Sequence, residues 1–159
     1  MQLIDPQTIS SEMVEFTSTL SAMSGDMIEK LFVIEAALKQ MPQVEVPLRH
    51  CFGNKVYVRE MTAPKGSILI GKMHKFKQVN IVIKGDISVL TEDGWKRLKS
   101  GDMFESPAGI KRAGFTHEDT VWTTICGTEE TEVEKAEDEL TIGSYQEFLQ
   151  YKGNPLCLS

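Results

Sequence analysis

Five side chains in the middle of the chain are of types that bind ligands, and their spacing groups them. Lys72 and His74 are two residues apart, as are Gln78 and Asn80, so each pair lies on one face of an extended strand. By the same alternation Ile68 and Ile70 precede the first pair on its face, and Val82 shares the face of the second pair. Arg112 follows a Pro-Ala-Gly turn later in the chain. Two cations, an imidazole and two amides suit a small anion, because arginine offers a bidentate fork and lysine a point charge. The sequence therefore predicts that these five residues bind a carboxylate, a phosphate or a nucleotide-like anion.

Two cations cannot be buried without a negative partner except at a high cost in free energy. Either a ligand or an internal acid such as Glu60 or Glu105 should therefore face them. The alternative is that Lys72 and Arg112 reach solvent at the mouth of a pocket, and that His74 is an interior histidine held by hydrogen bonds.

Catalytic motifs are absent from the sequence. It contains neither a Gly-x-Ser-x-Gly elbow nor a Walker-type loop. Cys51 follows His50 directly, but neighbours on a strand point to opposite faces, so we do not expect the pair to act together. The three cysteines are odd in number and widely spaced, which predicts reduced thiols rather than a disulfide framework or a zinc knuckle. No catalytic residue is assigned.

Short runs of β-branched and aromatic residues between residues 44 and 126 must position these side chains. They alternate with turns rich in glycine and proline, a spacing typical of an all-β sandwich or barrel. Asp93-Gly94 between two such runs is a hairpin signal, and no crossover helix fits between the runs, so we expect antiparallel pairing. The predicted strands are residues 56–58, 67–70, 79–83, 87–90, 95–98 and 120–125.

Two spaced motifs fall in this region. The first runs from Gly66 through Lys72, His74 and Gln78 to Gly85, and the second comprises Gly101, Pro107, Gly109 and Arg112. Their spacing resembles the two motifs of the cupin superfamily, the RmlC-like jelly rolls. The resemblance implies a mainly β fold: an antiparallel barrel with an N-terminal helical segment and short C-terminal helices. It also implies that the two strand faces and Arg112 point into the barrel. The turns would depend on Gly66, Gly85, Gly101, Pro107 and Gly109.

The same resemblance implies a divalent metal, because the family's ligands are two histidines and a glutamate in the first motif and a histidine in the second. Here those positions hold Lys72, His74, Gln78 and Arg112, so only one strong ligand is left. We therefore expect no cofactor and no metal enzyme. A metal held by His74 and Gln78 is the weaker alternative, and it needs a further histidine that turns inward. His117 does not offer one, because strand alternation counted from Arg112 places it on the outward face.

Residues 71–140 also resemble small cupin-type proteins encoded by tailed bacteriophages, in the stretches 80–82, 107–114 and 118–124. This implies a phage origin, a location in the host cytoplasm or in the virion, and no established activity. Three hypotheses follow: a non-enzymatic cupin that binds a small molecule, a virion or assembly accessory that uses the barrel as a scaffold, and a divergent metal-dependent enzyme.

The N-terminal part has a helical apolar seam, which Pro42 ends. Its steps are three or four residues, a heptad pattern with one extra step at Ser24-Gly25-Asp26. The segment is either one long helix starting at Asp5-Pro6 or two helices that meet at Gly25. The seam either packs on the chain's own barrel or forms a coiled coil, and we expect a homo-oligomer through residues 13–41. The seam residues are Met13, Phe16, Leu20, Met23, Met27, Leu31, Ile34, Leu38 and Met41.

Composition and charge limit the remaining options. The net charge is -6, with a concentration of acids in residues 129–139, and such a chain is not expected to bind nucleic acid, which requires phosphate neutralisation. No apolar run approaches a membrane span and no secretory signal is recognisable, so we expect a cytoplasmic protein.

Residues 131–140 and a capping box at Ser144–Glu147 predict two short helices. The expected organisation is a helical segment at 1–42, a β-barrel at 43–127 and a helical tail at 128–159.

Overall fold

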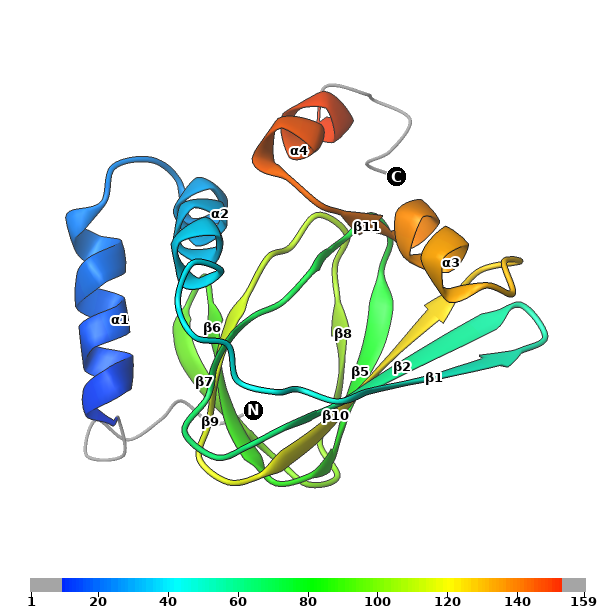
Figure 1. Ribbon diagram of the computed structural model, residues 1–159, viewed down its shortest axis with the longest axis horizontal. Coiled ribbons are helices and arrows are strands. Elements are labelled where there is room, and N and C mark those ends of the chain that lie inside the picture. The colour runs from blue at the N-terminus through cyan, green and yellow to red at the C-terminus, as the bar shows by residue number, and fades with distance from the viewer. Residues whose placement is uncertain (1–9, 153–159) are drawn as a thin grey trace.

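The computed structural model describes residues 10–152, and its body consists of two antiparallel sheets that face each other (Figure 1). The five-stranded sheet has the order β1 (Leu48–Gly53), β2 (Val56–Ala63), β10 (Thr120–Gly127), β5 (Gln78–Lys84) and β8 (Met103–Ser106). The four-stranded sheet has the order β3 (Ile68–Ile70), β9 (Ala113–Thr116), β6 (Asp86–Thr91) and β7 (Gly94–Lys99). A third, two-stranded sheet pairs β11 (Thr141–Ile142) with β4 (Met73–His74).

This arrangement confirms the predicted fold class, which is mainly antiparallel β with helices at both ends. The two large sheets enclose the interior between them, although within residues 10–152 their hydrogen bonding does not close into one continuous barrel. All six predicted strands are present. Five further strands of the described chain were not among the predicted runs, namely β1, β4, β8, β9 and β11. β4 and β11 have only two residues each, and β9 begins with Ala-Gly, which has low strand propensity.

Glycine is required at a turn that follows β5. Gly85 has φ of +99°, and a β-carbon there would lie 2.5 Å from the backbone oxygen of Asp119. The other three motif glycines also have positive φ and serve turns, as predicted: Gly66, Gly101 and Gly109.

Two N-terminal helices, α1 (Ser11–Ala22) and α2 (Met27–Leu38), replace the single long helix that was one of the two predictions. Ser10 caps α1 and Asp26 caps α2, while Gly25 between them has φ of +102°. The helix start predicted at Asp5-Pro6 lies outside the described residues.

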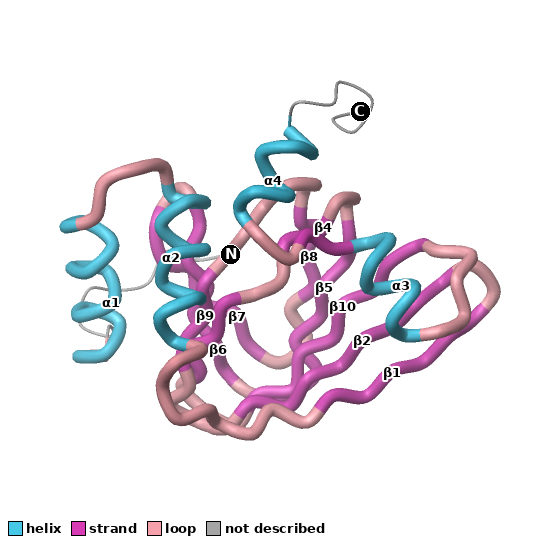
Figure 2. Tube along the Cα trace, turned by 45° about the horizontal axis from the view of Figure 1, so that its top comes forward, coloured by secondary structure: helices cyan, strands magenta, loops and turns pink. Residues whose placement is uncertain are grey.

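The apolar seam of both helices packs on the outer face of the four-stranded sheet, as Figure 2 shows for α2 beside β6 and β9. Its buried members share one core with sheet residues, and the indole nitrogen of Trp95 donates to Thr17 of α1. Because the seam is used within the chain, self-association through residues 13–41 stays a prediction and would need the helices' other faces. The shared core comprises Met13, Phe16, Leu20, Leu31, Ile34, Leu90, Trp95, Ala113 and Phe115.

The C-terminal helices α3 (Val133–Leu140) and α4 (Tyr145–Lys152) lie over one end of the sheets. Ala136 and Leu140 of α3 pack against Tyr57 and Cys126. Ser144 accepts a hydrogen bond from the backbone of Glu147, as its capping role predicts. None of the described helices is both long and apolar enough to cross a membrane.

Candidate functional site

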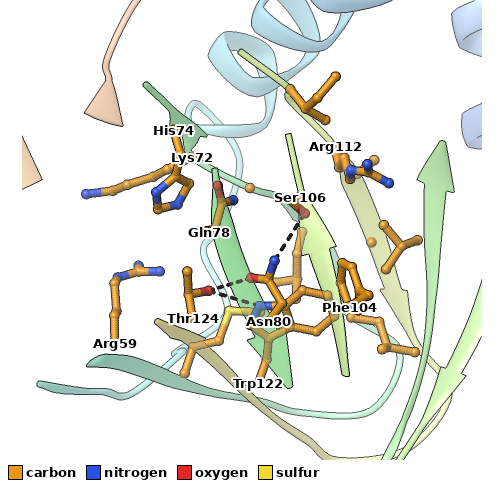
Figure 3. A pocket seen from close by; sticks show the side chains of 18 residues that line it. Arg59, Lys72, His74, Gln78, Asn80, Phe104, Ser106, Arg112, Trp122 and Thr124 are labelled. Atoms are coloured by element: carbon orange, nitrogen blue, oxygen red, sulfur yellow. Dashed lines mark hydrogen bonds between the residues drawn. The ribbon is translucent and has the colours of Figure 1, made fainter. Parts of the chain in front are cut away.

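A cavity of about 110 Å³ lies between the two large sheets, and all five side chains predicted to bind a ligand line it (Figure 3). Both sheets contribute apolar walls. His74 lines the cavity from β4, and Gly71, Lys72 and Ile110 line it from segments between the strands. The apolar wall residues are Met61, Leu69, Ile87, Val89, Phe104, Ile110, Ala113 and Trp122.

β5 positions two of the five. Gln78, Asn80 and Val82 alternate with more exposed residues along the strand, so they share the inward face, as predicted.

Lys72 and His74 were predicted to share a face with Ile68 and Ile70, and this is wrong. Ile68 and Ile70 pack towards the helices, while Leu69 lines the cavity. The physical reason is that β3 ends at Ile70 and β4 begins at Met73, so the alternation does not continue across the break.

A hydrogen-bonded chain holds Asn80 in place (Figure 3). Trp122 Nε1 donates to Thr124 Oγ1 at 3.2 Å, and Thr124 Oγ1 donates to Asn80 Oδ1 at 2.9 Å. Asn80 Nδ2 in turn donates to Ser106 Oγ at 3.1 Å. Both the oxygen and the nitrogen of the Asn80 amide are therefore hydrogen-bonded within the protein. Asn80 forms part of the cavity wall, and its amide is not left unpaired for a ligand.

Three cations and no carboxylate line the cavity, namely Arg59, Lys72 and Arg112. Glu137 of α3 lies outside this lining and faces two of them. Its Oε2 is 2.5 Å from Lys72 Nζ, and its Oε1 is 3.3 Å from Arg59 Nε. The Arg59 contact lacks hydrogen-bond geometry, since Arg59 Nε is buried without a hydrogen-bond partner. Three positive charges against one negative charge leave the site electropositive.

The internal acid is not one of those predicted. Glu60 pairs with Arg49, and Glu105 pairs with Lys77, both on the outer side of the five-stranded sheet. Burial alone would raise the pKa of Glu137, but the hydrogen bond and charge of Lys72, helped by Arg59, outweigh burial and lower that pKa. Glu137 is therefore ionised at neutral pH.

The side chains of Arg112 and Gln78 have no hydrogen-bond or ion-pair partner among residues 10–152. The Nε of Arg112 and the Oε1 of Gln78 are buried without a hydrogen bond, and no ion pair to Arg112 forms within residues 10–152. A buried donor or acceptor left unpaired costs about 1–3 kcal/mol. Arg59 Nε also lacks a hydrogen bond, but it lies against Glu137, so among the described residues Arg112 is the lining cation without a charged partner. A bound molecule could satisfy the Arg112 donor and the Gln78 carbonyl acceptor.

His74 is uncharged at neutral pH. Burial, reinforced by the charges of Arg59 and Lys72, lowers its pKa to about 4. Its Nδ1 lies 3.7 Å from the sulfur of Cys126, whose own pKa burial raises to about 11. Cys126 does not line the cavity, and its thiol stays protonated, so the pair lacks the features of an activated nucleophile.

The lowered pKa of His74 predicts a pH dependence of the stability of the fold. Between pH 6.5 and about 4 the unfolded chain protonates His74 and the folded chain does not, so the free energy of unfolding should fall as pH falls. His74 should account for a loss of up to about 3 kcal/mol over that window. Urea unfolding from pH 7 to pH 4.5 should show a flatter profile for His74→Gln than for the native protein.

His117 must be included in that comparison, because burial also lowers its pKa and its contribution has the same sign. It lies outside the cavity and hydrogen-bonds to Ser88. His117→Gln should remove a separate part of the slope. An unchanged slope in His74→Gln would contradict the assignment.

The donor set does not fit a divalent metal. Of the four positions that the resemblance relates to metal ligands, only His74 offers a strong ligand, and the cations Arg59, Lys72 and Arg112 line the same cavity. Within residues 10–152, no three side chains of His, Cys, Asp or Glu come together as a metal site would require. No step of any reaction is therefore assigned to a metal here.

Arg59 and Glu137 were missed by the sequence interpretation, although signals for both exist. Arg59 continues the inward alternation of Tyr57 beyond the predicted strand 56–58, since β2 extends to Ala63. Glu137 belongs to a run that reads as a solvated acidic face. However, it is one residue from Ala136 and three from Leu140, the buried residues of α3, and so it borders the face that packs inward.

No protein-family model and no curated protein matches the chain. Similar solved structures include a cupin superfamily protein from Desulfitobacterium hafniense, with a TM-score of 0.47 and 14% identity, covering 58% of this chain and 85% of that one. A cupin domain from Bordetella pertussis has a TM-score of 0.45 and 19% identity, covering 55% and 98%. An RmlC-like cupin family protein from Methanocaldococcus jannaschii, with a double-stranded β-helix fold, has a TM-score of 0.45 and 13% identity, covering 54% and 82%. Over a little more than half of its length, the chain is thus similar in structure to these cupin proteins.

Proposed function

We propose that the protein is a non-enzymatic binding protein for a small anion, which it holds in the cavity between the two sheets. The observation that carries the proposal is the composition of the lining: three cations, no carboxylate, and Arg112 with a buried, unpaired Nε. An anion would pair with this donor and offset the excess positive charge. A guanidinium suits a planar oxyanion best, so a carboxylate is the favoured ligand.

Two further features support binding over catalysis. The titratable imidazole of the cavity, His74, is held neutral with a pKa of about 4, far below the value suited to a general base at neutral pH. The volume of about 110 Å³ is below the ~150 Å³ of an engineered protein cavity that holds benzene, so it suits a small anion and not a whole nucleotide.

A scaffold role in a phage particle was the alternative that the sequence suggested. The apolar seam motivated it, and all of that seam except Met27 and Met41 packs against the chain's own sheet. The described residues give no further reason to propose a scaffold role, so the proposed function is located in the cavity.

The test is native mass spectrometry of freshly purified protein with elemental analysis, followed by NMR titration with small carboxylates and inorganic phosphate. We expect a co-purified anionic mass, or saturable shifts of the Arg112 and Gln78 side-chain signals. Stoichiometric tightly bound divalent metal, or titrations in which no anion moves those signals, would contradict the proposal.

Glu137 should weaken anion binding, because it neutralises Lys72 and Arg59 at the edge of the cavity. Glu137→Gln should therefore bind a small carboxylate about tenfold more tightly than the native protein does. The matched control is Glu134→Gln, an exposed acid on the same helix, which removes the same charge away from the site. Calorimetric titration measures both, and equal effects of the two changes would show that only net charge matters.

A further inference from the structure

Gln78 differs from the other amide of the cavity in having no partner. Its side chain is 8% exposed and lines the cavity, yet its Oε1 is buried without a hydrogen bond. Its Nε2 likewise bonds to no other group within residues 10–152. Asn80, two residues on, has both ends engaged by Thr124 and Ser106. The Gln78 amide is thus the one of the two that remains available to a bound molecule.

The carbonyl oxygen of this amide sets a chemical requirement. A plain carboxylate only accepts hydrogen bonds, so it could satisfy Arg112 but would leave Gln78 Oε1 unpaired. A ligand that satisfies both groups must combine an anionic acceptor with a hydroxyl or N–H donor.

We infer that the ligand is a small monocarboxylate that carries a hydroxyl or N–H group close to its carboxylate, and that Gln78 determines this specificity. The inference rests on the proposed anion-binding function and defines its ligand class. Arg112 receives the carboxylate and Gln78 Oε1 accepts from the donor. The apolar walls formed by Leu69, Ile87 and Val89 suit a short aliphatic body.

The test compares matched ligands on the native protein by NMR titration. Propionate, butyrate and pentanoate are each paired with their 2-hydroxy and 3-hydroxy counterparts, so that chain length and hydroxyl position are both covered. The best hydroxy acid should bind about tenfold more tightly than the plain acid of the same length, because it satisfies an acceptor that is otherwise buried and unpaired.

Gln78→Met serves as the variant, since it keeps the length of the side chain and removes the amide. It should lose the tenfold preference for the hydroxy acid over the plain acid of the same length. The native comparison needs no variant and stays decisive if Gln78→Met fails to fold.

The outcomes separate the two proposals. If plain and hydroxy acids bind equally and both are lost in Arg112→Gln, the anion site stands and the donor requirement is overturned. If no acid of either series binds to the native protein, the inferred ligand class is overturned, and if inorganic phosphate does not bind either, the anion site fails with it. A preference that persists in Gln78→Met would assign the acceptor to another group and overturn the role of Gln78.

Discussion

Arg112→Gln should weaken carboxylate binding by at least about 100-fold, which corresponds to about 3 kcal/mol. The substitution removes both the positive charge and the planar fork, and Arg59 and Lys72 cannot substitute because Glu137 already faces them. Arg112→Lys should recover only part of the affinity, since a lysine keeps the charge but not the bidentate geometry. Calorimetric or NMR titration of the three proteins measures these differences.

The stability of the same variant distinguishes a binding role from a structural one. Because the Arg112 side chain has no hydrogen-bond partner in the described part of the chain, replacing it breaks no hydrogen bond there. The melting temperature of ligand-free Arg112→Gln should be equal to that of the native protein or slightly higher. This is the expected signature of a residue held in place for function at some cost in stability.

Lys77→Gln is the matched control for Arg112→Gln, because Lys77 is 63% exposed and pairs with Glu105 outside the cavity. It removes one positive charge and should leave carboxylate affinity within about twofold. A large fall in melting temperature of Arg112→Gln with retained carboxylate binding would assign Arg112 to the fold instead.

Glu35→Ala should destabilise the protein by about 3 kcal/mol, the largest effect expected on stability. Lys111 has a side chain that is 1% exposed, and its Nζ lies 2.9 Å from Glu35 Oε2. The ammonium also lies over the ring of Phe32, 4.3 Å from its centre. Burial lowers the pKa of Lys111, against the opposing effect of the hydrogen bond that the ammonium donates to Glu35. Without Glu35, the buried ammonium has no negative partner.

Two further variants make the Glu35 prediction specific. Glu35→Leu combined with Lys111→Met should recover most of the lost stability, because no buried charge is then left unpaired. Lys39→Ala removes the other, 62% exposed partner of Glu35 and should cost less than about 1 kcal/mol. Urea unfolding of the set measures these values, and equal losses in Glu35→Ala and Lys39→Ala would contradict the prediction.

The buried pair also connects α2 to the cavity. Lys111 Nζ donates to the backbone oxygen of Gly71 at 3.1 Å, and the amide of Gly71 donates to the backbone oxygen of Arg112 at 2.8 Å. These bonds hold the segments before Lys72 and at Arg112 side by side. Glu35→Ala should therefore weaken anion binding as well as stability, although it touches no cavity residue directly.

Sequence patterns were sufficient for the strands with strong β propensity and for the inward face of β5, because alternation is a local property of an extended chain. They failed at Ile68 and Ile70, where the chain leaves the strand and the alternation is lost. They also left open whether the N-terminal seam binds its own sheet or another copy, because periodicity identifies an apolar face and not its partner.

The sequence by itself determined that the chain folds into antiparallel sheets, that Gly85 serves a tight turn, and that Lys72, His74, Gln78, Asn80 and Arg112 fall at motif positions. Tertiary structure alone decided which of these groups remain unpaired. The Asn80 amide is hydrogen-bonded to Thr124 and Ser106, and Lys72 is paired with Glu137, which lies 65 residues away along the chain. Gln78 Oε1 and Arg112 Nε have no hydrogen-bond partner among residues 10–152. The physical reason is that a residue's type sets which hydrogen bonds and charges it can offer, whereas the packing of distant segments sets which of them are already satisfied.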